Sequence, residues 1–186
     1  MKLIFLGGVQ GVGKTTLSEW LLREFTGKIE FVDPGELFRQ YYFREKLKTF
    51  DEIEDMFVEK ILSMPKDVTI LIHWHYAVTH MGGFIPQIGF SRLERLVTSE
   101  NVESVVLISV RVPVDIIRER RRKDFKGKKR ELSKESITLE VEKDLEFMGM
   151  HASLFMKHLG SRNVSSCVIE NIDLDIAKSK LREVCK

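Results

Sequence analysis

Residues 2–16 read KLIFLGGVQGVGKTT, and this stretch decides the fold. The apolar run at residues 3–6 predicts a buried strand, and the helical spacing of apolar residues from Leu17 onward predicts an amphipathic helix. Between them lies Gly8-x-x-x-x-Gly13-Lys14-Thr15, whose glycines let backbone N–H groups close around a phosphate. Strand, glycine loop and helix in this order predict a loop that binds the phosphates of a nucleoside triphosphate.

Each residue type in this phosphate loop has an expected role. Lys14 is expected to reach the β- and γ-phosphates and to act in catalysis, and the Thr15 hydroxyl is expected to ligate the cofactor Mg²⁺. The positive end of the following helix favours the same anion. The alternative is a glycine-rich turn that binds nothing. The expected ATP-binding residues of the loop are Gly8, Val9, Gln10, Gly11, Val12, Gly13, Lys14, Thr15 and Thr16.

Composition and length favour one soluble domain spanning residues 1–186. Hydrophobic residues make up 43% and charged residues 31% of the chain, with a net charge of only +2. No apolar run approaches the length of a membrane span, and no leader segment is expected before the glycine loop. Cys167 and Cys185 lie far apart without metal-ligand spacing, so a reducing, cytoplasmic location is expected.

Apolar runs alternate with helical patterns along the rest of the chain. Five strands are expected, at residues 3–6, 28–33, 68–72, 104–110 and 167–169. Helices are expected between them, with a break near residues 49–50 and an irregular segment over residues 73–91. This alternation predicts an α/β fold, a three-layer sandwich of the P-loop NTPase type with a five-stranded parallel sheet.

A second motif follows the second strand. Residues 33–39 read DPGELFR and resemble the G-[DE]-x-x-R segment with which nucleoside monophosphate kinases hold the acceptor nucleotide. Arg39, one helical turn after Gly35, would offer a fork of donors to the acceptor phosphate. The alternative for Arg39 is a solvated position on a helix surface. A helical acceptor-binding region is therefore expected at about residues 34–64.

A wider resemblance connects the chain to the archaeal-type adenylate kinases. Residues 70–78 read ILIHWHYAV and residues 83–88 read GFIPQI, similar to the D-T-H strand end and the G-Y-L-P-G-L segment of that family. The phosphate loop is also similar to the family's G-x-P-G-V-G loop. The resemblance implies transfer of the γ-phosphoryl of Mg-ATP to AMP, and a possible homo-oligomer such as a trimer. It implies acceptor-binding roles for Gly35, Arg39, His75, Gly83 and Pro86.

The chain departs from that family at four positions. His73 stands where the family has an aspartate that would help to hold Mg²⁺ through water, Trp74 and Tyr76 replace small polar residues, and Pro34 precedes Gly35. His73 is expected to be packed at the strand end and His75 to lie near bound nucleotide. Zinc binding by the histidines of residues 73–80 is the disfavoured alternative, because no carboxylate or cysteine stands at a matching offset.

A basic segment between residues 118 and 130 follows the fourth strand and its helix. Kinases of this class carry a lid there, expected here at about residues 118–134, whose cations stabilise the transferring phosphoryl group. Arg118 is expected to bind ATP, and Arg122 and Arg130 are expected to be catalytic. A solvated run of charges is one alternative. A short nucleic-acid patch, with Phe125 as its aromatic residue, is another.

Three functions remain open. The resemblance favours a nucleoside monophosphate kinase that makes two ADP from ATP and AMP, which needs no general base because the acceptor oxygen is already anionic. A P-loop kinase for another nucleotide or a small metabolite is the second. The third is a nucleotide-operated assembly factor with slow ATPase activity and an RNA or ribosomal partner, as some adenylate-kinase-like proteins are thought to be.

Overall fold

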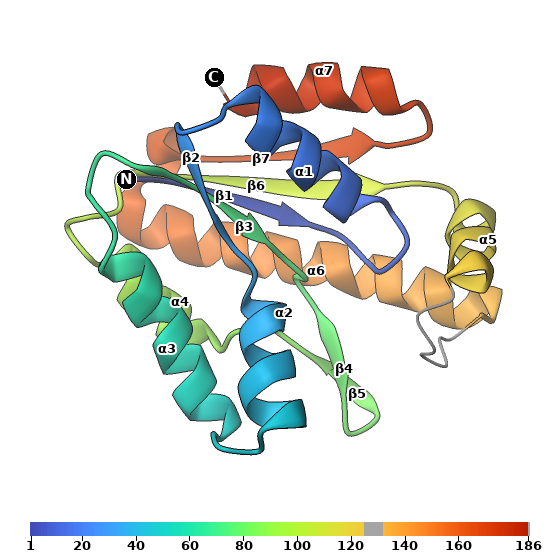
Figure 1. Ribbon diagram of the computed structural model, residues 1–186, viewed down its shortest axis with the longest axis horizontal. Coiled ribbons are helices and arrows are strands. Elements are labelled where there is room, and N and C mark those ends of the chain that lie inside the picture. Colours follow the sequence, from blue (N-terminus) through green and yellow to red (C-terminus); the bar gives the residue numbers. More distant parts are fainter. Residues whose placement is uncertain (125–131, 186) are drawn as a thin grey trace.

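The computed structural model describes residues 1–124 and 132–185, and its centre is a five-stranded parallel sheet (Figure 1). The strand order is β2-β3-β1-β6-β7, so the strand that precedes the phosphate loop lies in the middle. All four pairings are parallel. This confirms the predicted fold class. The strands are β1 (Lys2–Gly7), β2 (Ile29–Val32), β3 (Thr69–His73), β6 (Ser104–Arg111) and β7 (Val164–Glu170).

Helices cover both faces of the sheet (Figure 1). One face carries α1 (Lys14–Glu24) and α7 (Leu174–Cys185), and the other carries α3 (Phe50–Leu62), α4 (Phe90–Val97) and the long α6 (Lys134–Leu159). The helix α5 (Val114–Lys123) follows β6 at its carboxyl end. These helices occupy the stretches in which the sequence predicts them.

The central strand β1 has an apolar sequence because helices cover both of its faces. Leu3 and Phe5 pack into the core below α3, α4 and α6, whereas Ile4 and Leu6 pack into the core below α1 and α7. All four side chains are fully buried, as expected for a parallel strand that is covered on both faces. At the end of the strand, a Cβ on Gly7 would lie 2.1 Å from the ring of Tyr76, so only glycine fits there.

The region between β2 and β3 contains three helical elements. Here α2 (Pro34–Leu37) continues as the π-helix η1 (Phe38–Arg44) before the chain turns into α3. The predicted break at residues 49–50 is confirmed, because Thr49 caps α3 in a capping box with Glu52.

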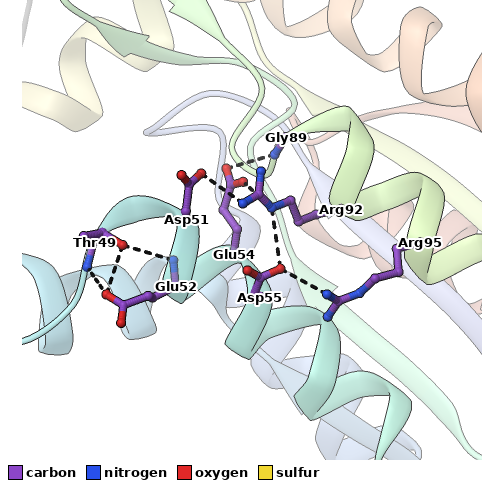
Figure 2. A network of polar contacts seen from close by, with 8 residues as sticks. All are labelled: Thr49, Asp51, Glu52, Glu54, Asp55, Gly89, Arg92 and Arg95. Carbon is purple, nitrogen blue, oxygen red and sulfur yellow. Dashed lines mark hydrogen bonds and ion pairs between the residues drawn. The ribbon is translucent and has the colours of Figure 1, made fainter.

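An ion-pair network holds α3 against α4 (Figure 2). The Arg92 guanidinium lies 3.1 Å from Asp51, 3.6 Å from Glu54 and 3.5 Å from Asp55. The Gly89 N–H donates to Glu54 at 2.9 Å, which ties the residue before α4 to the same cluster. The helical region is thereby attached to the main body at α4.

The segment over residues 73–91 is more ordered than its sequence predicts. It contains an antiparallel hairpin of β4 (Val78–His80) and β5 (Gly83–Ile85), shown in green in Figure 1. Met81 (φ 47°) and Gly82 (φ 79°) form the connection, and positive φ at both residues suits the twist of a two-residue hairpin. Methionine is rare in such a turn, so the sequence does not signal it. Within residues 1–124 and 132–185, no helix has the length and apolar character needed to cross a membrane.

Candidate nucleotide site

The phosphate loop connects the end of β1 to the start of α1, as its motif predicts. Gly8, Gly11 and Gly13 all have positive φ, between 96° and 130°, a conformation that glycine adopts without strain. At Gly8 a Cβ would also lie 2.6 Å from the Val110 carbonyl, so the loop could not run this close to β6 with any side chain there. The loop therefore depends on its glycines for its path.

The Lys14 side chain lies inside this loop. Its ammonium donates to the carbonyls of Gly8 and Val9, the latter at 3.2 Å, and the residue is only 5% exposed. Burial lowers the pKa of Lys14 to about 8, and the carboxylates of Asp144 and Asp33 oppose this shift. A buried cation held by two carbonyls and two distant carboxylates is a strong attractor for phosphate oxygens.

The residues that follow Lys14 face solvent. Thr15 and Thr16 lie exposed in the first turn of α1, directly beside the loop. The Thr15 hydroxyl is therefore accessible and fits the oxygen ligation that Mg²⁺ prefers together with phosphates. In the described part of the chain, no group of three or more His, Cys, Asp or Glu residues is placed to hold a metal ion by itself.

Two arginines of α5 donate to backbone carbonyls of the loop, and the sequence analysis assigned no role to either of them. Arg121 donates to the Gln10 carbonyl at 3.0 Å and forms a bidentate pair with Glu140 of α6, at 3.2 and 2.5 Å. Arg120 donates to the Gly11 carbonyl at 3.2 Å. Arg118 has a buried Nε without a hydrogen-bond partner, and Arg122 is exposed.

The roles expected for Arg118, Arg122 and Arg130 in a lid stay predictions. Arg130 and Phe125 lie outside the described residues, as does the middle of the expected lid, residues 125–131.

The segment after β7 completes the outer wall of the loop. The Asn171 amide donates to the Val12 carbonyl at 2.8 Å, and its backbone N–H donates to the Arg111 carbonyl at 2.7 Å. A Cβ on Gly13 would lie 2.3 Å from the Asn171 amide nitrogen, so the two residues are in close contact. Asn171 thereby connects the ends of β6 and β7 to the phosphate loop.

Two cavities adjoin the loop. One, of about 320 Å³, is lined by Gly13, Thr16, Arg120, Asn171, Ile172 and Leu174. Ile172 is 60% exposed and Leu174 is 37% exposed, so the cavity offers apolar surface beside the Arg120 guanidinium. The planar base of a nucleotide whose phosphates lie in the loop would pack against this apolar surface. The other cavity, of about 270 Å³, lies among the ends of β6 and β7, α5 and α6, with Val9 and Val12 in its wall.

Asp33, directly after β2, interacts electrostatically with Lys14 and pairs with Arg39. Its carboxylate accepts from Arg39 at 2.8 Å, and His73 Nδ1 lies 4.0 Å from the same oxygen. Burial and the Lys14 charge lower the pKa of His73 to about 4 against the pull of Asp33, so the imidazole is neutral at pH 7. The His73–Asp33 contact is therefore not an ion pair, and Arg39 is the cationic partner of Asp33.

Of the remaining acceptor residues expected from the sequence, Gly35 and His75 both lie against the buried Gln87, which follows Pro86. A Cβ on Gly35 would lie 3.7 Å from the Gln87 Nε2, and the His75 backbone N–H donates to the Gln87 Oε1 at 2.8 Å. Gly35 is next to the Arg39 pair: a Cβ on it would lie 3.0 Å from Asp33 and 3.2 Å from Arg39. His75 lies at the start of the phosphate loop. Burial together with the Lys14 charge holds the pKa of His75 well below the usual range, although the Gly8 backbone opposes this shift. Gly83 is exposed in β5, and Pro86 follows that strand.

The two aromatic departures, Trp74 and Tyr76, belong to the core. Both are fully buried, and the Tyr76 hydroxyl lies 3.2 Å from the carbonyls of Phe5 and Ile108. The Tyr76 N–H donates to Asp144 of α6 at 3.1 Å. Burial raises the pKa of Asp144 to about 6 while the Lys14 charge opposes the rise. The segment after β3 thus places a buried carboxylate behind the loop lysine.

Several of these residues were missed by reasoning from the sequence, although two left a signal. Arg121 stands four residues after the buried Ile117, which places it on the inner face of α5. Asp144 stands within the apolar stripe of α6, seven residues after the buried Ile137. Asn171 and the pairing of Asp33 left no comparable signal, because both depend on contacts between distant segments.

The chain is similar to a solved structure and to one protein family. The shikimate kinase from Acinetobacter baumannii in complex with shikimate is similar at 18% identity over 98% of this chain and 90% of that one, with a TM-score of 0.49. Among curated proteins, none matches the chain significantly. The family described as AAA domain matches residues 7–138, which run from the phosphate loop into α6. This match covers well over half of the residues of the chain, so the chain belongs to the AAA domain family.

Proposed function

We propose that this protein is an ATP-dependent phosphotransferase of the nucleoside monophosphate kinase type, with AMP as its acceptor. The observation that carries the proposal is the buried Lys14 ammonium inside a glycine loop, together with Arg39 paired to Asp33 at the end of β2. Residues 70–88, similar to the archaeal-type adenylate kinases, support AMP as the acceptor.

In this proposal the chain positions charge and excludes water. Lys14 and the loop N–H groups hold the donor phosphates, Thr15 ligates Mg²⁺, and the cavity beside Arg120 takes the base of ATP. Mg²⁺, when bound, neutralises charge between the β- and γ-phosphates. Arg39 turns from Asp33 to the acceptor phosphate, which exchanges one anionic partner for another. Arg122 and Arg130 bridge donor and acceptor when the lid segment closes.

A second candidate acceptor follows from Asp33. A carboxylate paired to Arg39 at 2.8 Å reduces the positive charge available for an acceptor phosphate. The same carboxylate could accept the proton of an acceptor hydroxyl, because it is an ionisable base at the end of β2 facing Lys14. A small hydroxylated metabolite is therefore the second candidate acceptor.

An acceptor panel separates the two candidates. ADP formation from Mg-ATP would be measured alone, with AMP, CMP, UMP and GMP, and with hydroxylated metabolites. We expect AMP to stimulate turnover strongly, Lys14→Ala to remove at least about a hundredfold of it, and the exposed Lys28→Ala to change little. Stimulation only by a hydroxylated compound, abolished by Asp33→Asn, would establish the second candidate. ATP turnover that no acceptor stimulates would contradict both candidate functions.

Arg39 provides the control for acceptor binding. Arg39→Ala should raise KM for AMP far more than KM for ATP, because in this proposal Arg39 binds the acceptor phosphate and not ATP. Arg23→Ala, an exposed arginine of α1, should alter neither. Equal weakening of both substrates by Arg39→Ala would remove Arg39 from the acceptor site.

A further inference from the structure

The far end of the helical region carries an exposed cluster of aromatic and basic side chains. We call it the aromatic tip and define it by Tyr42, Phe43, Leu47, Phe50, His80 and Met81, with Arg44, Lys46 and Lys48 beside them. Its residues come from η1, the turn before α3, the first residue of α3 and the β4–β5 hairpin, which lie together at the lower end of the molecule in Figure 1.

The apolar side chains of the tip are open to solvent. Phe43 is 63%, Leu47 71% and Met81 94% exposed, which is unusual for three large apolar residues in one place. The rings form a chain of contacts. Tyr42 meets Phe43 at 5.0 Å and Phe50 at 4.6 Å between ring centres, and Phe50 meets His80 at 5.5 Å. These contacts hold the rings in place while leaving a free face of Phe43.

Unpaired cations surround these rings. In the described part of the chain, Arg44, Lys46 and Lys48 form no ion pair. Of the carboxylates in the same segment, Asp51 pairs with Arg92, whereas Glu45 and Glu52 accept from the uncharged Gln40 and Thr49 and keep their negative charge. Backbone and side-chain hydrogen bonds from Thr49, helped by the Lys48 charge, lower the pKa of Glu52. The ammonium groups of Lys46 and Lys48 form no ion pair in the described part of the chain and are therefore available to an anionic ligand.

A shallow cavity combines the two features. It has a volume of about 350 Å³ and is lined by Tyr42, Phe43, Lys46 and Lys48, two rings and two ammonium groups. No residue of the phosphate loop contributes to it, nor does Arg39. A ligand for this cavity needs a planar apolar part to lie against a ring and an anionic part to meet the lysines. A nucleotide of an unpaired strand has both, whereas a base in a duplex has its faces covered.

We infer that the aromatic tip binds a single-stranded nucleic acid, with bases stacked on Phe43 and Tyr42 and backbone phosphates on Lys46 and Lys48. This site is separate from the phosphate loop and goes beyond the proposed phosphotransfer. It would let the protein hold an unpaired strand whether or not ATP is bound.

Fluorescence anisotropy with labelled rU, dT and duplex oligonucleotides of equal length tests whether the aromatic tip binds an unpaired strand. We expect the unpaired oligonucleotides to bind at least about fivefold more tightly than the duplex, because stacking requires an accessible base face. The rU and dT arms show whether RNA is preferred to DNA. Binding should persist with saturating Mg-ATP. Equal duplex binding, or loss of binding with Mg-ATP, would overturn the inference.

Matched variants locate the site. Phe43→Ala should weaken binding at least about fivefold, the effect of losing one stacked base, while the exposed Ile176→Ala of α7 should not. Lys46→Asn with Lys48→Gln should reduce the slope of log affinity against log salt by about 1.4, since each phosphate contact on a single strand contributes about 0.7. Lys66→Asn with Lys180→Gln is the charge control. Asparagine is chosen at position 46 because Lys46 has a positive φ of 52°, which asparagine tolerates.

Three results would assign the tip differently. If Phe43→Ala raised KM for the acceptor and left oligonucleotide binding unchanged, the cavity would belong to the acceptor site. If the variant lost only self-association in sedimentation, the partner would be a second copy. If Phe43→Ala bound like the wild type, no base would stack on this ring.

Discussion

At the scale of single residues, the electrostatics of the site centre on Lys14. The motif predicts the position of this lysine, but the state of its ammonium depends on groups that the motif does not contain. Burial lowers its pKa to about 8, Asp144 raises it most among the charges, and Asp33 raises it less. The loop lysine is thus balanced between desolvation and two carboxylates from distant segments.

Affinity for Mg-ATP should consequently depend on pH. Phosphates favour the charged lysine, so binding above pH 8 requires proton uptake, and we expect Kd to rise from pH 7 to pH 9.5. Asp144→Asn removes the largest attracting charge and should move the onset of this rise to lower pH. Asp33→Asn should move it less. Calorimetric titration across pH measures this directly; an onset that stays in place, or moves upward in Asp144→Asn, would contradict the assignment.

At the scale of elements, the strands and most helices could be predicted, and the exceptions have a common cause. Residues 104–110 are apolar enough to predict a buried strand without any tertiary information. The β4–β5 hairpin and the π-helix η1 could not be predicted, since Met81 takes a conformation that its residue type disfavours. Local pattern is informative where burial enforces a period, and uninformative where the chain follows contacts with other segments.

The attachment of α3 to α4 gives an element-scale prediction. Arg92, 27% exposed in its side chain, meets Asp51, Glu54 and Asp55 together (Figure 2). Arg92→Gln should lower the free energy of unfolding by ~1–2 kcal/mol in low salt, because three carboxylates lose their shared cation. Lys143→Gln, which breaks the exposed pair with Glu146, should cost less than about 0.5 kcal/mol.

Urea unfolding with and without 1 M salt measures both variants. The difference in free energy of unfolding between Arg92→Gln and the wild type should be smaller in high salt. Salt screens the ion-pair network that the variant removes. An Arg92→Gln effect no larger than that of Lys143→Gln would mean that packing alone holds α3 against α4.

At the scale of the whole molecule, the phosphate loop is held by segments from opposite parts of the chain. Arg120 and Arg121 reach it from α5, and Asn171 reaches it from the end of β7. The parallel sheet brings these together, since its strands all end on the same edge, which is where ligands bind in such folds. The family match over residues 7–138 stops before the segment that supplies Asn171.

Asn171 therefore provides a test of this long-range support. Asn171→Ala leaves the buried Val12 carbonyl without its donor, and should cost ~1–3 kcal/mol of unfolding free energy and about tenfold in Mg-ATP affinity. Asn163→Ala removes a similar amide bond, 2.9 Å to the Leu159 carbonyl, at an exposed helix end. It should leave Mg-ATP affinity unchanged. Parallel thermal unfolding and nucleotide titrations would compare them, and equal affinities in the two variants would contradict a supporting role.

By itself, the sequence determined the strand–loop–helix motif, the five-stranded parallel sheet and the order of its helices, because burial and glycine requirements leave a local pattern. Only the tertiary structure decided that Asp33 pairs with Arg39, that Arg120 and Arg121 contact the phosphate loop, and that exposed rings gather at one tip. These features depend on distances between segments far apart along the chain. Residue spacing carries no information about such distances, so they could not be predicted.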